Sequence, residues 1–345
     1  MFQIAPLPRT LEAARRDLSS AKAEVRADAA RDLGQQGHGP DAPERITLLI
    51  TALSDSSPVV RRTAVVALAD LEAKEALPTL LTLLADADLR VRQMVVLALG
   101  ELARDGDREV EGRLLGLTRA GDAAIRYQAL AAVAGLLHDG ARSEILAAAS
   151  DQDAEIRELG VRLAAQHLTA GRPLDPAVEA LLRQGAADGA ARVALAAEIE
   201  ALTLGLDVGV AHVLDLLAGR LRGSEAADER RAIGLCAQRG IQAAVPILRR
   251  RGLGWFGISI DPYRWPIRAA LARLGEPRAA RAILRGLRSR RWLTRTLAVE
   301  AAGEAGLVDL RRHLTLLEDR AELVDQDVLK QALLALSDGP APPAC

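Results

Sequence analysis

Aromatic residues make up only 2% of this 345-residue chain, although half of its residues are hydrophobic. The core must therefore be built from Ala, Leu, Val and Ile. Such small side chains let helices approach each other closely, as a layered stack of helix pairs requires. Lysine is also scarce, with three residues among 45 basic ones, so nearly all of the positive charge is on arginine.

Cysteine and long hydrophobic runs are scarce as well. The two cysteines, Cys236 and Cys345, are too few to form a disulfide framework or a zinc site by themselves, which favours a reducing cytoplasm. The N-terminus lacks the apolar segment of a signal peptide. The most hydrophobic later stretch is interrupted by Asp207, His212 and Asp215. We therefore expect a cytoplasmic protein without a membrane span.

A β-branched residue followed by arginine recurs with a regular period. The arginines are Arg26, Arg61, Arg92, Arg126 and Arg157, at intervals of 31 to 35 residues. A fixed period in this range is typical of a stacked helical solenoid, in which no single unit can bury its own apolar face. The period thus predicts an all-α fold.

Each repeat is expected to contain two helices. The first is short and rich in leucine, and a proline such as Pro78 or Pro246 can open it. A turn that often contains aspartate follows. The second helix contains the periodic arginine, and apolar residues stand three, six and seven positions after it, as in Ala64, Ala67 and Leu68. This spacing predicts one buried stripe on the second helix.

The Asp-x5-Arg spacing and the trailing Ala-x-x-Ala-Leu-Gly resemble HEAT repeats of the short bacterial type, which also occur in phycobilisome (PBS) lyases. The resemblance is strong over residues 19–170 and 261–306. It implies a right-handed α-solenoid, an armadillo-type superhelix, of about ten HEAT-like helix pairs. It also implies that the second helices line the concave face, and that a structural ladder joins successive repeats through Asp55, Arg61, Asp86, Arg92, Asp151 and Arg157.

The regularity of the repeats divides the chain into four regions. We expect regular HEAT-like repeats over residues 1–170 and degenerate ones over 171–240. Residues 241–338 are expected to form C-terminal HEAT-like repeats with a basic, aromatic insertion loop. A disordered tail is expected over 339–345. The last repeat has Leu329 in the position of the periodic arginine, as a terminal unit without a following neighbour allows.

Positive charge is concentrated in residues 245–300. This segment has thirteen arginines against Asp261, Glu276 and Glu300, a net charge of +10, so the rest of the chain sums to -11. A basic block on an otherwise acidic protein indicates an anionic partner.

The same segment departs from the repeat pattern. About ten residues with three glycines and a proline separate the two helices of one repeat, and insertions in solenoids often form binding loops. Five of the seven aromatic residues lie in or near this insertion. In the helix after Pro277, four arginines fall within an arc of about 80°. The candidate partner-binding residues are Trp255, Phe256, Tyr263, Trp265, Arg268, Arg278, Arg281, Arg285, Arg288 and Trp292.

Plainer interpretations exist for these features. The four arginines can be an ordinary solvated face, and Trp265 and Trp292 can fill an irregular core. Residues 252–257 match G-x-G-x-x-G, but they follow a helical segment rather than the strand that dinucleotide binding requires. We find no catalytic constellation and no metal-ligand spacing, and we expect no cofactor.

The sequence thus predicts a non-enzymatic HEAT-repeat scaffold whose Arg/Trp-rich C-terminal third binds an acidic protein partner. A nucleic-acid-binding protein is the first alternative, because arginines and stacking aromatics suit phosphates and bases as well. The second alternative is a bilin-lyase-like chromophore chaperone, which the repeat type alone suggests.

Overall fold

The computed structural model describes residues 9–104, 106–169, 173–221, 226–254, 259–318, 320 and 322–337. Every regular element within these ranges is helical. The chain divides into two compact units, Met1–Leu181 and Leu182–Cys345, hereafter unit 1 and unit 2. The prediction of an all-α solenoid built from helix pairs is confirmed.

The helices are as follows. Those that begin in unit 1 are α1 (Leu11–Leu18), α2 (Ala23–Gln35), α3 (Ala42–Ala52), α4 (Pro58–Asp70), α5 (Leu77–Thr82), α6 (Leu89–Leu102), α7 (Arg108–Leu117), α8 (Ala123–Leu137), α9 (Arg142–Ala148), α10 (Ala154–His167) and α11 (Pro176–Ala186), which crosses the boundary. Those of unit 2 are α12 (Ala191–Thr203), α13 (Ala211–Leu217), α14 (Ala226–Gln238), α15 (Val245–Leu253), α16 (Arg264–Arg273), α17 (Pro277–Leu287), α18 (Trp292–Glu304), α19 (Arg311–Thr315) and α20 (Gln326–Ser337). Short 3-10 turns extend several of the first helices.

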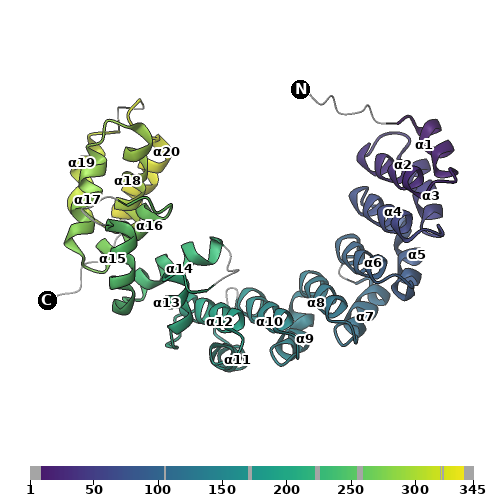
Figure 1. The fold of residues 1–345 in the computed structure, drawn as a ribbon, viewed down its shortest axis with the longest axis horizontal. Helices are drawn as coiled ribbons and strands as arrows, with labels where there is room; N and C mark the ends of the chain where they lie inside the picture. Colours follow the sequence, from purple (N-terminus) through teal and green to yellow (C-terminus); the bar gives the residue numbers. More distant parts are fainter. Residues whose placement is uncertain are drawn as a thin grey trace. The chain divides into compact units, whose positions relative to one another are not determined.

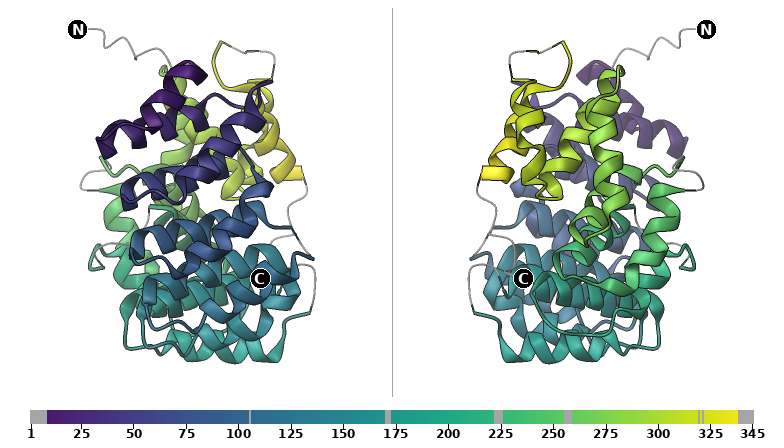
Figure 2. Two further views of the ribbon diagram at one scale, coloured as in Figure 1. Left: turned by 90° about the vertical axis from the view of Figure 1, so that its right-hand side faces the viewer. Right: turned by 90° about the vertical axis from the view of Figure 1, so that its left-hand side faces the viewer.

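Within unit 1 the helices form two layers. Each second helix packs against the next second helix, α2 on α4, α4 on α6, α6 on α8 and α8 on α10. The first helix of each pair packs against the second helix of the same repeat, so the first helices form the other layer (Figure 1; Figure 2, left view). The expected apolar stripe lies between the layers, because Val95, Ala98 and Leu99 are at most 2% exposed.

The glycine that ends the repeat motif has a packing role. A Cβ atom on Gly100 would lie 2.8 Å from the Cβ of Ala132 on α8. Carbon atoms cannot approach this closely, so a larger residue would push the two helices apart. Glycine therefore sets the close contact between α6 and α8.

The periodic arginines of unit 1 connect neighbouring repeats. Arg61 donates from Nε and Nη2 to the two carboxylate oxygens of Asp86 in the next repeat, at 2.7 Å each. Its Nη1 donates to the main-chain carbonyl of Asp55, 2.8 Å away. Asp86 also accepts a hydrogen bond from the amide of Asp88 at the start of α6. Each rung therefore fixes a turn, a helix start and the adjacent repeat together.

The same bidentate pair joins Arg26 to Asp55 and Arg126 to Asp151. Arg92 differs from the expected ladder. The position that would supply its carboxylate, six residues before Arg126, is Ala120. Within the described residues Arg92 makes no ion pair, and its Nη1 donates to the carbonyls of Asp86 and Ala87. Arg157 donates from Nη1 to the carbonyls of Asp151 and Gln152, at 2.9 and 3.1 Å.

The ladder makes unit 1 sensitive to acid. The hydrogen-bonded Arg61 holds the pKa of Asp86 below its ordinary value, and Arg26 and Arg126 act likewise on Asp55 and Asp151. A pKa that is lowered by folding contributes stability that is complete above the ordinary value of about 3.9 and is lost as the pH falls through the lowered value.

We therefore expect the stability difference between the native chain and Asp86→Asn to be largest at neutral pH and to shrink below about pH 4. Urea unfolding at a series of pH values measures it. Asp70→Asn, which alters an exposed aspartate outside the ladder, should change stability little. A difference for Asp86→Asn that stays constant down to pH 2 would contradict the ladder's role.

Unit 2 keeps the two layers but replaces most of the ladder. The second helices α12, α14, α16, α18 and α20 pack in sequence, and α15 contacts both α13 and α17 in the first-helix layer. In α14, Arg231 pairs with Glu200 of α12 at 2.8 and 2.9 Å. In α18, Arg295 donates to the carbonyl of Leu323. The helix pairs thus continue through the region expected to be degenerate.

Candidate interaction groove

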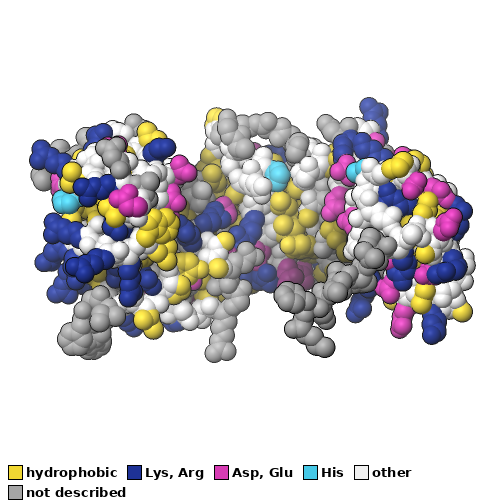
Figure 3. Space-filling model, turned by 90° about the horizontal axis from the view of Figure 1, so that it is seen from above, with side chains coloured by type: hydrophobic (Ala, Val, Ile, Leu, Met, Phe, Trp, Pro, Cys, Tyr) yellow, Lys and Arg dark blue, Asp and Glu magenta, His cyan; other side chains and the backbone are white. Residues whose placement is uncertain are grey.

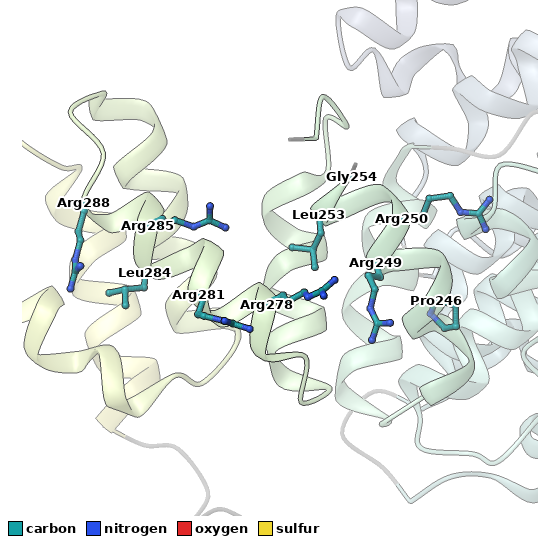
Figure 4. A pocket seen from close by; sticks show the side chains of 10 residues that line it. All are labelled: Pro246, Arg249, Arg250, Leu253, Gly254, Arg278, Arg281, Leu284, Arg285 and Arg288. Atoms are coloured by element: carbon teal, nitrogen blue, oxygen red, sulfur yellow. The ribbon is translucent and has the colours of Figure 1, made fainter. Parts of the chain in front are cut away.

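A groove of about 940 Å³ lies in unit 2 between the first helices α15 and α17. Its lining includes six arginines, Arg249, Arg250, Arg278, Arg281, Arg285 and Arg288, together with Pro246, Leu253, Gly254 and Leu284. Figure 4 shows Arg278, Arg281 and Arg285 extending from α17 toward α15. Lysine and arginine side chains also gather over this part of unit 2 in Figure 3. We call this site the arginine groove.

The local sequence of α17 determines which way its arginines point. Gly275, with φ of 87°, ends α16. The Glu276 carboxylate then accepts a hydrogen bond from the main-chain amide of Arg278 at the start of α17. One face of α17 is buried, with Ile283 at 0% and Leu287 at 6% exposure. Arg278, Arg281 and Arg285 of α17, and Arg288, which follows its last residue, are exposed and line the groove.

Negative charge at the groove is limited to its end. Glu276 is 7% exposed and forms an ion pair with Arg249. Burial acts to raise its pKa, but the Arg278 amide and the Arg249 guanidinium together hold the pKa below its ordinary value. Arg251 turns away to Asp261 and Glu229, at 2.8 and 2.6 Å. No described residue that lines the groove is acidic.

Arg268 on α16 adds positive charge next to the groove. Its Nε donates to the carbonyl of Gly252 at the end of α15, and its guanidinium lies 4.7 Å from the centre of the Trp265 ring. Burial lowers its pKa, and the nearby charges of Arg264 and Arg285 lower it further. No described carboxylate forms an ion pair with Arg268, so its charge adds to the field of the arginine groove.

The expected aromatic residues lie in different places. Trp265 is 5% exposed and packs in the core with Ile283 and Leu287, so its ring is not available to a partner. Tyr263 is half-buried, and its hydroxyl donates to the carbonyl of Ala226. Trp292 is 45% exposed at the start of α18 but does not line the groove.

Two predicted anchor residues remain. Trp255 and Phe256 lie outside the described residues. The described ends of their loop are Gly254, which lines the groove, and Ser259, whose hydroxyl donates to the carbonyl of Arg251. The loop that contains them therefore begins at the groove, and they remain predicted partner-binding residues.

Trp265 sets the position of α17. A Cβ atom on Gly286 would lie 2.4 Å from Cη2 of Trp265 and 2.7 Å from the Cβ of Ala298. We expect Gly286→Ala to destabilise the protein by about 1–2 kcal/mol, because the added methyl overpacks the core by more than the gain in helix propensity. Thermal unfolding measures this. Gly234→Ala in α14, where a Cβ would meet nothing within 4 Å, is the matched control and should not destabilise.

The sequence did not single out the α15 side of the groove. Arg249 and Arg250 belong to the basic block, and Leu253 has no predicted role. Helical spacing predicts Leu284 on the face opposite the arginines, whereas the structure has it lining the groove with them. The sequence feature that points to this wall of the groove is the run of three arginines at the end of a helix opened by Pro246. This feature alone does not identify a binding site, because the HEAT resemblance implies that the second helices line the concave face, whereas the groove belongs to the first-helix layer.

The described residues contain no candidate metal site, membrane-spanning helix or reactive thiol. They contain no group of three or more His, Cys, Asp or Glu residues placed to hold a metal ion. None of the described helices is both long enough and apolar enough to cross a bilayer. The buried Cys236 is shielded from water, which raises its pKa to about 12, so its thiol is inert.

The paired helices and their Asp–Arg rungs define an α-solenoid. Family comparison matches HEAT repeats at residues 46–112 and the PBS lyase HEAT-like repeat at residues 25–55. The chain therefore contains HEAT repeats, and the resemblance drawn from the Asp–Arg spacing is confirmed. No curated protein sequence matches the chain. HEAT repeats are typical of protein-interaction scaffolds.

Several solved structures are similar to the chain. A chain of the Kap95p–RanGDP complex has 15% identity and a TM-score of 0.50, over 94% of this chain and 51% of that one. YibA of Escherichia coli has 14% identity and a TM-score of 0.47, over 93% and 98%. The phycocyanin lyase complex of CpcE and CpcF from Nostoc sp. PCC7120 has 17% identity and a TM-score of 0.31, over 97% and 98%. The likeness to the chain of the Kap95p–RanGDP complex, at 15% identity, supports the fold alone.

Proposed function

We propose that this protein is a non-enzymatic scaffold that binds an acidic polypeptide of its partner in the arginine groove. The observation that supports this most directly is the convergence of six arginines on one groove whose described lining contains no carboxylate. Folding brings these like charges together, and the mutual repulsion of those other than Arg249, which is paired with Glu276, destabilises the compact state. A surface that is costly in the free protein and favourable in a complex is typical of a binding site.

The groove also suits a polypeptide because it is not purely ionic. Pro246, Leu253 and Leu284 give it an apolar part beside the arginines. Apolar anchors supply affinity, while arginines steer the partner and pair with its carboxylates. Trp255 and Phe256, which follow the groove residue Gly254 in sequence, are proposed as further anchors.

A nucleic acid is the alternative ligand that a specific observation favours, since arginines bind phosphates equally well. The net charge of +10 over residues 245–300 favours nucleic-acid binding, whereas the net charge of -11 on the rest of the chain would repel a long polyanion. A bilin-lyase-like role is supported by the PBS lyase HEAT-like repeat match, but this match covers residues 25–55, away from the groove.

Thermal unfolding in low salt tests the proposal. We expect poly-L-glutamate to raise the Tm of the native chain, because a ligand that binds only the folded state stabilises it. Arg285→Gln should raise the Tm of the free protein by about 1–2 °C, by relieving repulsion, and should weaken the response to poly-L-glutamate. Arg312→Gln, at an exposed arginine on α19 outside the groove, should leave that response unchanged.

Two results would overturn the proposal. If single-stranded DNA stabilises the protein more than poly-L-glutamate does at physiological salt, and Arg285→Gln weakens that effect, the groove binds nucleic acid. If neither polymer produces a shift that depends on Arg285, the arginines of α17 form an ordinary solvated face.

A further inference from the structure

The arginines of α17 are spaced as one face of a helix, and this spacing restricts what can bind them. Resting on the proposed function, we infer that the occupant of the arginine groove is an acidic amphipathic α-helix of a partner protein, lying along α17 with its carboxylates on the arginines. The groove belongs to the first-helix layer of unit 2, so the partner docks on the side of the repeats opposite to the second helices.

The axial positions of the charges favour a helix. Arg278, Arg281, Arg285 and Arg288 follow each other in steps of three, four and three residues. At a rise of about 1.5 Å per residue, the two steps within α17 are about 4.5 and 6 Å, and Arg288 follows the last residue of the helix. Acidic residues on one face of a second helix repeat by the same steps, so a second helix alongside can pair with each arginine of α17.

An extended peptide does not match this spacing. Its side chains on one face recur about every 6.6–6.8 Å, so carboxylates that are in phase with the first arginine fall out of phase at the next. Only some of the four arginines would then be paired. A helical and an extended peptide can have the same charge, so this difference in pairing comes from the spacing of their side chains alone.

The apolar residues fit the same occupant. Leu284 lies between Arg281 and Arg285 on α17, and Leu253 faces the groove from α15. Two helices with an apolar strip between them form the kind of groove in which an amphipathic helix lays its apolar face. Arg250 on α15 can then contact acidic residues on the far edge of the bound helix.

Three peptides with the same set of side chains and the same net charge, titrated into the full chain, test the inference. The first is a lactam-stapled helix with glutamates in steps of three, four and three residues and leucines beside them. The second has the same staple, but its glutamates are distributed around the helix. The third keeps the order of the first but contains D-amino acids at alternate positions, which prevent helix formation. We expect the first to bind at least about 10-fold more tightly than the other two.

A charge swap adds a test of the pairing. Arg285→Glu should weaken binding of the first peptide. When each of the four glutamates of that peptide is replaced by lysine in turn, only one replacement should restore the affinity for the Arg285→Glu variant. The equivalent swap with Arg312→Glu should produce no such pattern, because Arg312 lies outside the groove.

The outcomes separate this inference from the proposed function. If all three peptides bind equally and lose affinity in Arg285→Glu, the groove binds acidic polypeptides but does not select a helix, and the inference fails alone. If poly-L-glutamate binds but no peptide does, the inference is also wrong. If neither poly-L-glutamate nor any peptide responds to the groove arginines, the proposed function fails.

Discussion

Reversing Arg281, Arg285 and Arg288 together to glutamate is expected to lower the affinity for poly-L-glutamate by a factor on the order of 100 or more in low salt. Each reversal removes an attraction and adds a repulsion, and three such changes together amount to about 3 kcal/mol or more. The loss should lie mainly in slower association and in a flatter dependence of the rate on salt, because long-range steering is removed. Surface plasmon resonance at several salt concentrations measures both.

The matched control reverses Arg16, Arg90 and Arg119, three exposed arginines of unit 1. This variant has the same net charge as the groove variant, so any difference between the two reports the location of the charge. Equal losses in both variants would show that net charge alone governs binding, and the arginine groove would lose its assignment. Circular dichroism of each variant verifies that the helices are retained.

Arg61→Ala is expected to destabilise unit 1 by about 2–3 kcal/mol. The substitution removes two hydrogen bonds to Asp86 and those to the carbonyls of Asp55 and Ser56. It also leaves the Asp86 carboxylate, whose side chain is 5% exposed, without its cation. A buried polar group without its partner costs more free energy than the bond itself contributed. Urea unfolding followed by circular dichroism measures the change, and affinity for poly-L-glutamate should persist in the folded fraction.

Arg92→Ala is the control, because Arg92 occupies the same repeat position but faces Ala120 instead of an aspartate. Its loss should cost only about 1 kcal/mol, because it removes hydrogen bonds to the carbonyls of Asp86 and Ala87 but leaves no carboxylate without its cation. Equal destabilisation by the two substitutions would show that the carboxylate rung contributes nothing. Replacing Asp86 and Arg61 together should cost less than the two single changes added, since no unpaired charge remains.

The ladder illustrates how far repeat reasoning reaches. A fixed period identifies equivalent positions, so the sequence could assign Arg61 and Arg92 to the same place in the fold. The repeat pattern predicts the same ladder contact for both arginines, although the residues that face them in the next repeat differ. The carboxylate that pairs with Arg61 comes from the next repeat, and the corresponding residue for Arg92 is Ala120. Reading each arginine with the repeat that follows it would have found the difference.

The sequence by itself determined the all-α solenoid, the buried stripe of the second helices and the exposed arginine face of α17. These properties follow from local periodicity, because the side chains of one helix share a face at fixed spacings. Tertiary structure decided that Trp265 lies in the core and that the second wall of the arginine groove is α15. Residues of α15 and α17 lie on either side of the groove because both helices pack against the intervening α16, at close contacts of Gly252 with Ile267 and of Gly286 with Trp265. A groove between helices that are not adjacent in sequence depends on packing across layers, which no periodicity within one helix specifies.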